Sequence, residues 1–479
     1  METFGIEYGY EGQVTPSIAN SYTSINSKIT KFADVCWGDT EPTAPFTFLW
    51  ITSHNYNWSK LDSFINAWQT VAYTEYTFVV RSKCSWGTSP TIPVIPELSV
   101  YQNMASCPPT AKHMNNYILW LKELVSRYSG KVPSKTMPGL KYPVKYWEIE
   151  SEAASPMFWL GTKDDYSNML KAAYTTIKSI DPSATVLLSG INLNDMLKYP
   201  LTEEQMMSMI NSKPAPWNTF LQNGIAFFRD NLRYSNYFDV IEFHSMHDYE
   251  CIPNIVNQIN LECDKAGCPR KPIWVGDATS TPHSTPSPVD FYPIPEPAAS
   301  YNYIMWWPDN PQYPQASAWF LEEQSKLAIK KMALTPATGC QKIFMGTLID
   351  WPWYSGYPYN GLVNTVVDPS TNKKSYTKKP VYNAMSYFIS TFSGFTSCSY
   401  STINGVWIVK FLFTNGRIGY VCWSENGQQD ITLNFNYDSK LLNKFIETDY
   451  NIQKVIATNT FNRQTTVTVN DVPLIVVQS

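Results

Sequence analysis

The feature that most constrains the fold is an eightfold alternation of short β-rich runs with longer amphipathic stretches. Apolar residues three and four apart mark the helical stretches, for example from Met114 to Tyr128. Another stretch, from Tyr166 to Ile180, has Thr162 as a helix cap before it and Asp181-Pro182 as a stop after it. The eight strands are expected at Phe4–Tyr8, Ala33–Trp37, Thr77–Arg81, Val144–Ile149, Thr185–Ser189, Val240–His244, Ile273–Asp277 and Ile343–Ile349. Strand and helix repeated eight times predict an α/β fold, a parallel (β/α)8 barrel of the TIM type.

The helical period disappears from about Thr396. Alternating strand-like runs then follow, separated by turn pairs such as Asn-Gly and Asp-Ser. The runs are Gly405–Phe413, Arg417–Trp423, Ile431–Tyr437, Lys444–Thr448, Lys454–Asn459, Thr465–Asn470 and Pro473–Val477. We therefore expect a barrel domain over 1–394 and a small antiparallel β-sandwich over 395–479.

Two connections are too long to be simple turns: Ser82–Thr110 after the third strand, and Ala278–Gln315 after the seventh. Long loops at the carboxyl end of a barrel are where substrate recognition is built. Such proline-rich loops can also serve only to brace the surface. For the second loop we favour binding, because its aromatic residues, Trp306 and Trp307 among them, would otherwise be an exposed apolar liability.

The composition excludes several classes of protein. Hydrophobic residues make up 44% of the chain, which excludes disorder. Charged residues are 16%, against about 25% in an average protein. A net charge of −4 without a run of Lys and Arg argues against nucleic acid as a partner. No apolar stretch approaches the roughly 20 residues of a membrane-spanning helix.

Nine cysteines are too few for a disulfide scaffold in a chain of 479 residues, and their spacings do not fit a zinc site. Buried free thiols are one interpretation. Pairing, which would fit an oxidising compartment or a thermophilic host, is the other, and the odd number leaves at least one thiol free. The candidate pairs are Cys84 with Cys107, Cys263 with Cys268, and Cys398 with Cys422.

No secretory signal is expected at the start of the chain, because Phe4-Gly5-Ile6 already has the pattern of the first strand. Low charge with abundant Tyr, Asn, Ser and Thr is typical of extracellular proteins of thermoacidophiles. We expect an extracellular, surface or particle-associated protein, whose export signal was trimmed or which leaves the cell by another route.

Two of the expected strands lead directly to carboxylates. The segment Val144–Ala153 contains Glu152, and the segment Pro272–Asp277 ends on Asp277. In one parallel barrel the carboxyl ends of both strands lie at the same open end of the barrel, its mouth. Hydrolysis of a glycosidic bond uses two carboxyl groups that lie close together at such a place. Glu152 could instead be a surface residue, but the apolar strand before it points it at the mouth. Glu148 and Glu150 share the segment; Glu148 lies more than about 10 Å deeper at about 3.3 Å per residue.

The first segment, Trp147-Glu148-Ile149-Glu150-Ser151-Glu152-Ala153, resembles the Trp-Glu-Ile-Trp-Asn-Glu-Pro signature of the clan A retaining glycoside hydrolases, families 39 and 5 among them. The resemblance implies that Glu152 is the acid/base. The second segment resembles the seventh strand of that clan, Pro-Ile-Trp-Val-Thr-Glu, whose Glu is the nucleophile. Asp277 stands at this position.

The sequence departs from the clan pattern at several positions facing the reaction. Ser151 replaces the Asn that contacts the sugar 2-hydroxyl, and a serine reaches less far. In the sixth strand His244 matches the clan, while Met246 replaces a Tyr that touches the nucleophile and His247 follows it. A lone histidine is more often structural than catalytic, and contact of His244 with substrate is the competing interpretation.

Tryptophans at strand ends are candidates for stacking on sugar rings. Trp351, after the eighth strand, resembles the tryptophan that forms the floor of the sugar subsite in the clan, and Trp353 is the alternative. Trp37 and Trp86 could add subsites or could be core residues. Because the chain has neither a Gly-rich phosphate loop nor a His-Glu-x-x-His motif, we expect no cofactor and no metal.

Together these features predict a glycoside hydrolase that cleaves β-linked oligo- or polysaccharides with two carboxylates. Retention of configuration is expected from the resemblance. Because aspartate is one methylene shorter than glutamate, inversion and loss of activity remain the alternatives. The competing hypothesis is a catalytically impaired carbohydrate-binding protein, or a glycan-recognition module of a cell surface or virus particle. The sugar, the linkage, endo or exo action and the oligomeric state stay open.

Overall fold

The fold is described from a computed structural model of the chain. The residues it describes are 2–8, 25–48, 51–71, 73–93, 105–192, 202–214, 217–246, 248–281, 309–350, 361–367, 370–371, 374–438, 440–445, 456–459 and 462–478.

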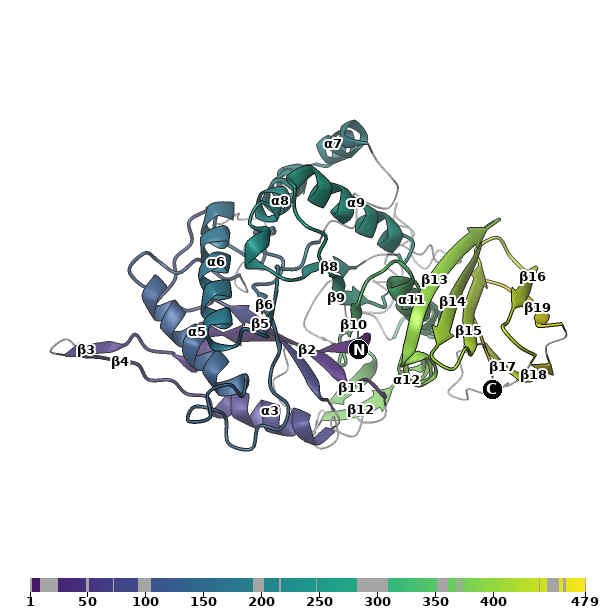
Figure 1. The fold of residues 1–479 in the computed structure, drawn as a ribbon, viewed down its shortest axis with the longest axis horizontal. Helices are drawn as coiled ribbons and strands as arrows, with labels where there is room; N and C mark the ends of the chain where they lie inside the picture. The colour runs from purple at the N-terminus through teal and green to yellow at the C-terminus, as the bar shows by residue number, and fades with distance from the viewer. Residues whose placement is uncertain are drawn as a thin grey trace.

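Eight parallel strands form a closed barrel, as the alternating pattern predicts (Figure 1). They are β1 (Phe4–Tyr8), β2 (Ile29–Cys36), β5 (Glu75–Arg81), β6 (Tyr146–Ile149), β7 (Thr185–Leu187), β8 (Ile241–Ser245), β9 (Ile273–Thr279) and β10 (Lys342–Gly346). Their spatial order is β7-β6-β5-β2-β1-β10-β9-β8. A parallel bridge between Leu187 and Val240 joins the two end strands and closes the ring. The (β/α)8 prediction is therefore confirmed, and each of the eight predicted strands overlaps an observed one.

Helices surround the barrel and bury the apolar stripes seen in the sequence. The larger ones are α3 (Ser59–Val71), α5 (Met114–Tyr128), α6 (Lys163–Ile180), α7 (Glu203–Ser212), α8 (Trp217–Leu232), α9 (Cys251–Ala266), α11 (Tyr313–Ala337) and α12 (Pro380–Phe392). The predicted cap of α6 is present: Thr162 Oγ1 accepts from the Asp165 amide, and the Asp165 carboxylate accepts from the Thr162 amide at 2.8 Å. Trp37, expected to end the second strand, instead begins the one-turn helix α2 (Trp37–Thr40).

Two hairpins interrupt the repeat and were not anticipated from the sequence. The first, β3 (Phe46–Phe48) with β4 (Ile51–Ser53), projects away from the barrel (Figure 1). The second, β11 (Val363–Val367) with β12 (Lys374–Lys378), follows β10. Neither has a long alternating pattern that would announce a strand.

The C-terminal region is antiparallel throughout and fits the predicted β-sandwich. One sheet has six strands in the order β13-β14-β15-β20-β17-β18, and β16 pairs with β19 in a second. The strands are β13 (Phe395–Ile403), β14 (Val406–Phe413), β15 (Ile418–Ser424), β16 (Gln429–Asn434), β17 (Lys440–Phe445), β18 (Ile456–Asn459), β19 (Gln464–Val469) and β20 (Leu474–Gln478). The sequence pattern missed β13, an edge strand whose mostly exposed Ser, Thr and Tyr residues show no apolar alternation.

The β-domain packs firmly on the barrel through α11 and α12. Phe388 and Phe392 on α12 contact the ring of Phe411 on β14, the latter pair at 4.3 Å between centroids. Lys326 and Lys330 on α11 form ion pairs with the β-domain at 2.6 and 2.7 Å, with Asp471 and Glu425 as partners. The interface therefore continues the barrel's apolar core into the sheet.

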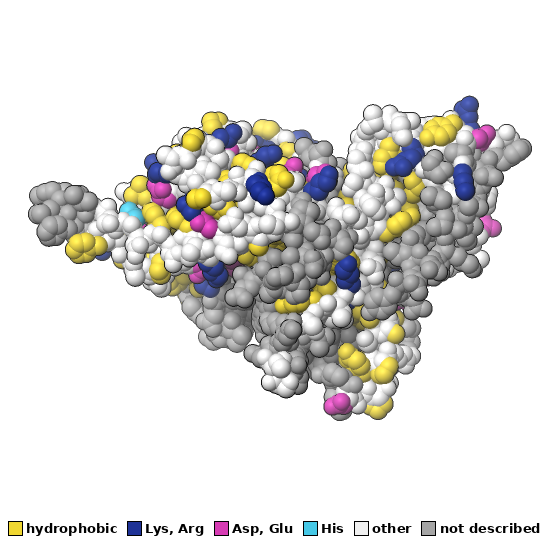
Figure 2. Space-filling view, turned by 90° about the horizontal axis from the view of Figure 1, so that it is seen from below, with side chains coloured by type: hydrophobic (Ala, Val, Ile, Leu, Met, Phe, Trp, Pro, Cys, Tyr) yellow, Lys and Arg dark blue, Asp and Glu magenta, His cyan; other side chains and the backbone are white. Residues whose placement is uncertain are grey.

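The cysteines are free thiols in this structure, so the three possible disulfide pairings are not formed. Within the described part of the chain, no helix combines the length and the apolar character needed to cross a membrane. On the face drawn in Figure 2, Lys and Arg side chains of the described residues lie scattered over both parts of the molecule.

Candidate active site

Charged side chains from four strands occupy the barrel interior. Glu7 (β1), Lys31 (β2), Glu148 (β6) and Glu242 (β8) are all buried. Glu7 and Lys31 are register partners on adjacent strands. Barrel interiors are usually filled by bulky apolar residues, so a charged layer at this place requires mutual neutralisation.

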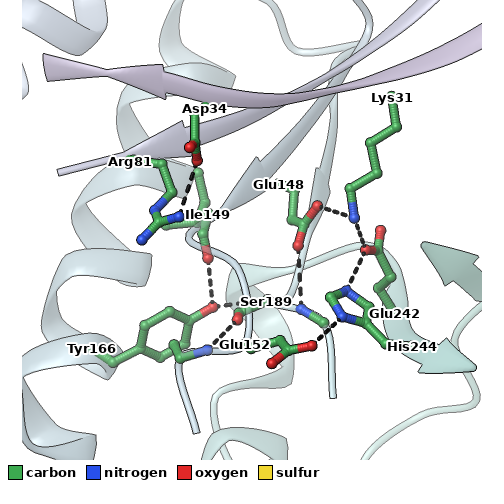
Figure 3. A network of polar contacts seen from close by, with 12 residues as sticks. Lys31, Asp34, Arg81, Glu148, Ile149, Glu152, Tyr166, Ser189, Glu242 and His244 are labelled. Atoms are coloured by element: carbon green, nitrogen blue, oxygen red, sulfur yellow. Dashed lines mark hydrogen bonds and ion pairs between the residues drawn. The ribbon is translucent and has the colours of Figure 1, made fainter. Parts of the chain in front are cut away.

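Lys31 supplies that neutralisation. Its ammonium contacts Glu148 Oε2 at 2.8 Å and also Glu242 Oε1 (Figure 3). Burial lowers the pKa of Lys31, but the surrounding carboxylates outweigh it and hold the pKa above its ordinary value. Burial and the neighbouring Glu242 charge raise the pKa of Glu148 to about 7. Burial raises the pKa of Glu242, but Lys31 and His244 outweigh it, and the pKa lies below its ordinary value.

Glu148, Glu242 and His244 place ligand atoms within 4.8 Å of one another, a spacing that could hold a metal ion. The Lys31 ammonium already contacts both carboxylates. The chain itself thus provides the cation that this cluster needs.

His244 connects the buried layer to the barrel mouth. Its Nε2 lies 3.5 Å from Glu242 Oε1, and its Nδ1 lies 2.6 Å from Glu152 Oε1. Burial lowers the pKa of His244, but the hydrogen bonds to Glu152 and Glu242 outweigh it and hold the pKa well above 6.5. A protonated ring donates from both nitrogens, so His244 can bridge the two carboxylates as an imidazolium.

Two glycines make room for this chain of contacts. A Cβ at Gly276 would collide with the Glu242 carboxylate, and a Cβ at Gly190 would collide with the His244 ring. Neither position needs a left-handed backbone, so space is the reason for glycine here.

The loop after β6 carries Glu152 in a constrained conformation. Glu150 and Glu152 have φ angles of 61° and 44°, in the left-handed region. Such conformations cost about 1 to 3 kcal/mol each and persist only where neighbours fix them. Glu150 is fixed by the Ser82 amide at 2.6 Å and by Arg81 Nε at 3.1 Å.

Two further anchors hold the same loop (Figure 3). Tyr166 Oη, from α6, donates to the Ile149 carbonyl at 3.0 Å and accepts from the Ser189 amide at 2.9 Å. Ser189 Oγ in turn accepts from the Ala153 amide at 2.7 Å. The loop is therefore tied to β7 and α6 on both sides of Glu152.

These contacts distinguish the three glutamates of the segment. Glu148 and Glu150 are fully buried and held by Lys31 and Arg81. Glu152 keeps 5% of its surface exposed and accepts from His244 and, at 3.3 Å, from Asn192 Nδ2. Glu152 therefore stays the candidate acid/base, and Asn192, which lies beyond β7, is a contact that the sequence pattern did not indicate.

Asp277 lies next to this group on β9. It is the register partner of His244, whose ring contacts Glu152. The pairing of β8 with β9 shifts between Phe243 and His244, and Gly276 is the extra residue. This bulge re-aims the end of β9, as bulges next to active sites commonly do.

Glu7 is a site residue that the sequence analysis missed. A Cβ built on Gly346 would lie 2.7 Å from Glu7 Oε2 and 3.2 Å from Asp277 Oδ1, so both carboxyls lie over one glycine of β10. The sequence did contain a hint: Glu7 is the one charged residue in the otherwise uncharged strand β1.

The other predicted binding residues differ in their positions. Ser151 is half-buried on the loop beside Glu152. Trp37 is fully buried, and its Nε1 donates to Glu41 Oε2 at 2.8 Å. Neither face of Trp37 is open to a sugar, so its prediction as a stacking platform does not fit the structure. Trp86 is partly buried edge-on against Trp37, at 4.7 Å between centroids, and donates to the Glu41 carbonyl.

Trp351, Trp306, Trp307, Trp353 and His247 lie outside the described residues. Their expected roles stay predictions.

No protein-family model matches the sequence, and no curated protein matches it by sequence. Solved structures do match. A glucosidase from Croceicoccus marinus has a TM-score of 0.57 at 12% identity, over 100% of this chain and 95% of that one. A family 39 glycoside hydrolase from Bacteroides cellulosilyticus WH2 has a TM-score of 0.56 at 13% identity, over 100% and 81%. An endoxylanase of glycoside hydrolase family 30 from Clostridium papyrosolvens C71 has a TM-score of 0.56 at 12% identity, over 100% of this chain and 96% of that one.

All three of these proteins are glycoside hydrolases. At such low identity the likeness shows the shared fold, a barrel with a β-domain, and the function has to be argued from the site.

Proposed function

We propose that the protein is a glycoside hydrolase that cleaves β-glycosidic bonds in an oligo- or polysaccharide with retention of configuration. Glu152 is the acid/base and Asp277 the nucleophile. The observation that supports the proposal is that Glu152 contacts the His244 ring, while Asp277 is the register partner of His244 on the neighbouring strand. The likeness of the fold to glycosidases supports a carbohydrate substrate.

In the first step Asp277 attacks the anomeric carbon while the bond to the leaving oxygen breaks. The leaving oxygen takes the bonding pair and the proton of Glu152. In the second step Glu152 removes a proton from water, and the resulting hydroxide displaces Asp277 from the anomeric carbon. Both carboxyls return to their starting protonation states.

His244 acts as a positioning residue for Glu152. When Glu152 gives up its proton, the new carboxylate lies 2.6 Å from the imidazolium nitrogen, which stabilises the negative charge. Glu242, behind the ring, keeps His244 charged and oriented, and Lys31 holds Glu242 in place. The buried charged residues thus hold a positive charge next to Glu152 before the negative charge forms on its carboxylate.

Substrate recognition is proposed for Ser151, beside the acid/base, and for Trp86, Trp351, Trp306 and Trp307. Tryptophan rings stack on the apolar face of a sugar and leave its hydroxyls to polar neighbours. Action outside the cell or at a particle surface is part of the proposal, since glycans of this kind are met there.

One observation favours a second candidate function. Asp277 lies beside the buried Glu7 carboxyl, and an aspartate at the nucleophile position reaches less far than a glutamate. A protein that binds β-glycans without turnover, as a surface or virion recognition module, would keep the same cleft.

Hydrolysis of a panel of aryl β-glycosides and β-glycans separates the two functions, with glycan binding measured in parallel. The anomeric proton of the first product, followed by NMR, tests retention. Binding without any product would move the protein to the second function, and an inverted product would remove Asp277 as nucleophile.

A further inference from the structure

Glu7 lies near the carboxyl end of β1, and the proposed mechanism gives it no role. It is 8% exposed, and its register partner on β2 is Lys31. The Lys31 ammonium, however, contacts Glu148 and Glu242 on the other side. Glu7 is therefore a buried carboxyl beside a lysine whose ammonium already contacts two other carboxylates.

Glu7 Oε2 has no hydrogen-bond donor among the described residues. A buried acceptor without a partner costs about 1 to 3 kcal/mol, more if it is charged. Among the described residues, Asp277 brings a polar atom near it: Glu7 Oε2 and Asp277 Oδ1 both lie close to the same point above Gly346. Two carboxylates cannot hydrogen-bond each other unless one carries a proton.

The charges around Glu7 favour that proton. Burial raises the pKa of Glu7 well above its ordinary value, and the charge of Asp277 and its hydrogen bond raise it further. The opposing charges are those of Lys31 on β2 and His244 on β8. On the remaining neighbouring strand, β10, the facing residue is Gly346, which has no side chain to contribute.

We propose that Glu7 and Asp277 hold one proton between them, and that the Glu7 carboxylic acid orients the Asp277 carboxylate for attack. The role of Glu7 as a positioning residue rests on the proposed function, whereas the shared proton does not. The proton stays on the pair during the reaction, because Asp277 attacks through its other oxygen. Loss of this proton at high pH places two negative charges side by side and removes the hydrogen bond that orients Asp277.

The kinetic test uses a dinitrophenyl β-glycoside, whose leaving group departs with little help from an acid. In the pH profile of kcat/KM, the fall at high pH that is due to deprotonation of Glu152 then disappears. A fall at high pH that remains reports the loss of the proton from Glu7; we call it the alkaline limb. Above that limb we expect kcat/KM of the wild type to fall about 10- to 100-fold, the range expected for loss of a charged hydrogen bond.

Glu7→Gln keeps an N–H donor but cannot ionise, so it should retain activity and lose the alkaline limb. Glu7→Ala lacks the donor and should lose activity at every pH. Glu75→Gln is the matched control: this carboxylate binds Lys342 and Tyr146 at the opposite end of the barrel, and its loss should leave the limb in place. An alkaline limb that persists unchanged in Glu7→Gln overturns the positioning role.

A second readout does not depend on turnover. The infrared difference spectrum of wild type minus Glu7→Gln, at about pH 6, should show a positive carbonyl band of a protonated carboxylic acid, because the bands of other protonated carboxyls such as Glu148 cancel. Absence of that band refutes the shared proton. Presence of the band in a protein that hydrolyses no β-glycan supports the shared proton and rejects the proposed function instead.

Discussion

Replacing Lys31 by methionine tests whether the charged layer of the barrel is held by one cation. The Lys31 ammonium is 1% exposed and contacts two carboxylates that are fully buried. Methionine fills a similar volume without the charge. Removing one partner of a buried ion pair costs about 3 to 5 kcal/mol, because the other charge is left without compensation. Against a typical total stability of about 5 to 15 kcal/mol, this is a large share.

The cost should depend on pH in a defined direction. Without Lys31, the folded-state pKa of Glu148, which is already about 7, rises further, and that of Glu242 rises above the unfolded value. The folded variant therefore binds more protons than the unfolded chain does. Stability of the variant should therefore fall as pH rises through that window. Urea unfolding at about pH 5 and at about pH 8 should show the larger deficit at the higher pH.

Two variants make the test specific. Lys28→Met removes an exposed lysine that lies 3.6 Å from Glu2, and a surface pair of this kind contributes about 0 to 1 kcal/mol. The double variant Lys31→Met/Glu242→Gln also removes one of the two carboxylates that lose their cation, and it should recover part of the loss. A cost for Lys31→Met below about 1 kcal/mol, or one equal at both pH values, refutes the reasoning.

Three further expectations concern the site. Glu152→Gln should bind glycan normally and lose about 100- to 10,000-fold in turnover of unactivated substrates, with a smaller loss in the first step for dinitrophenyl glycosides; near-normal turnover would exclude Glu152 as the acid. Gly276→Ala should push Glu242 out of its contacts with Lys31 and His244 and cost about 3 kcal/mol or more in chemical unfolding, so an unaltered midpoint would contradict the packing described. Trp306→Ala and Trp307→Ala should weaken transition-state binding of long oligosaccharides by about 1 to 3 kcal/mol, seen mainly as a higher KM, and leave small aryl glycosides unaffected; equal effects on both would argue against a distal subsite.

The barrel could be predicted from the sequence because its determinants are local. Each strand is a short apolar run, and each helix shows its apolar stripe. The start of α6 can be read from Thr162 and Asp165, which lie three residues apart and form its cap. Position along a strand also carried information: in a parallel barrel, residues just beyond β6 and at the end of β9 must lie at one mouth. That rule selected Glu152 and Asp277 without any knowledge of their contacts.

Other features depended on contacts between residues far apart in the chain. Lys31 lies 211 residues from Glu242, and His244 lies 92 residues from Glu152, so no local pattern reveals their pairing. For the same reason Gly276 and Gly190 gave no hint that they make room for other side chains, and the choice between a core and a binding role for Trp37 stayed open. Charge and hydrogen-bonding capacity can be read from each residue alone. Which charges neutralise one another, and which oxygen is left without a donor, is decided only when the closed barrel brings its strands into register.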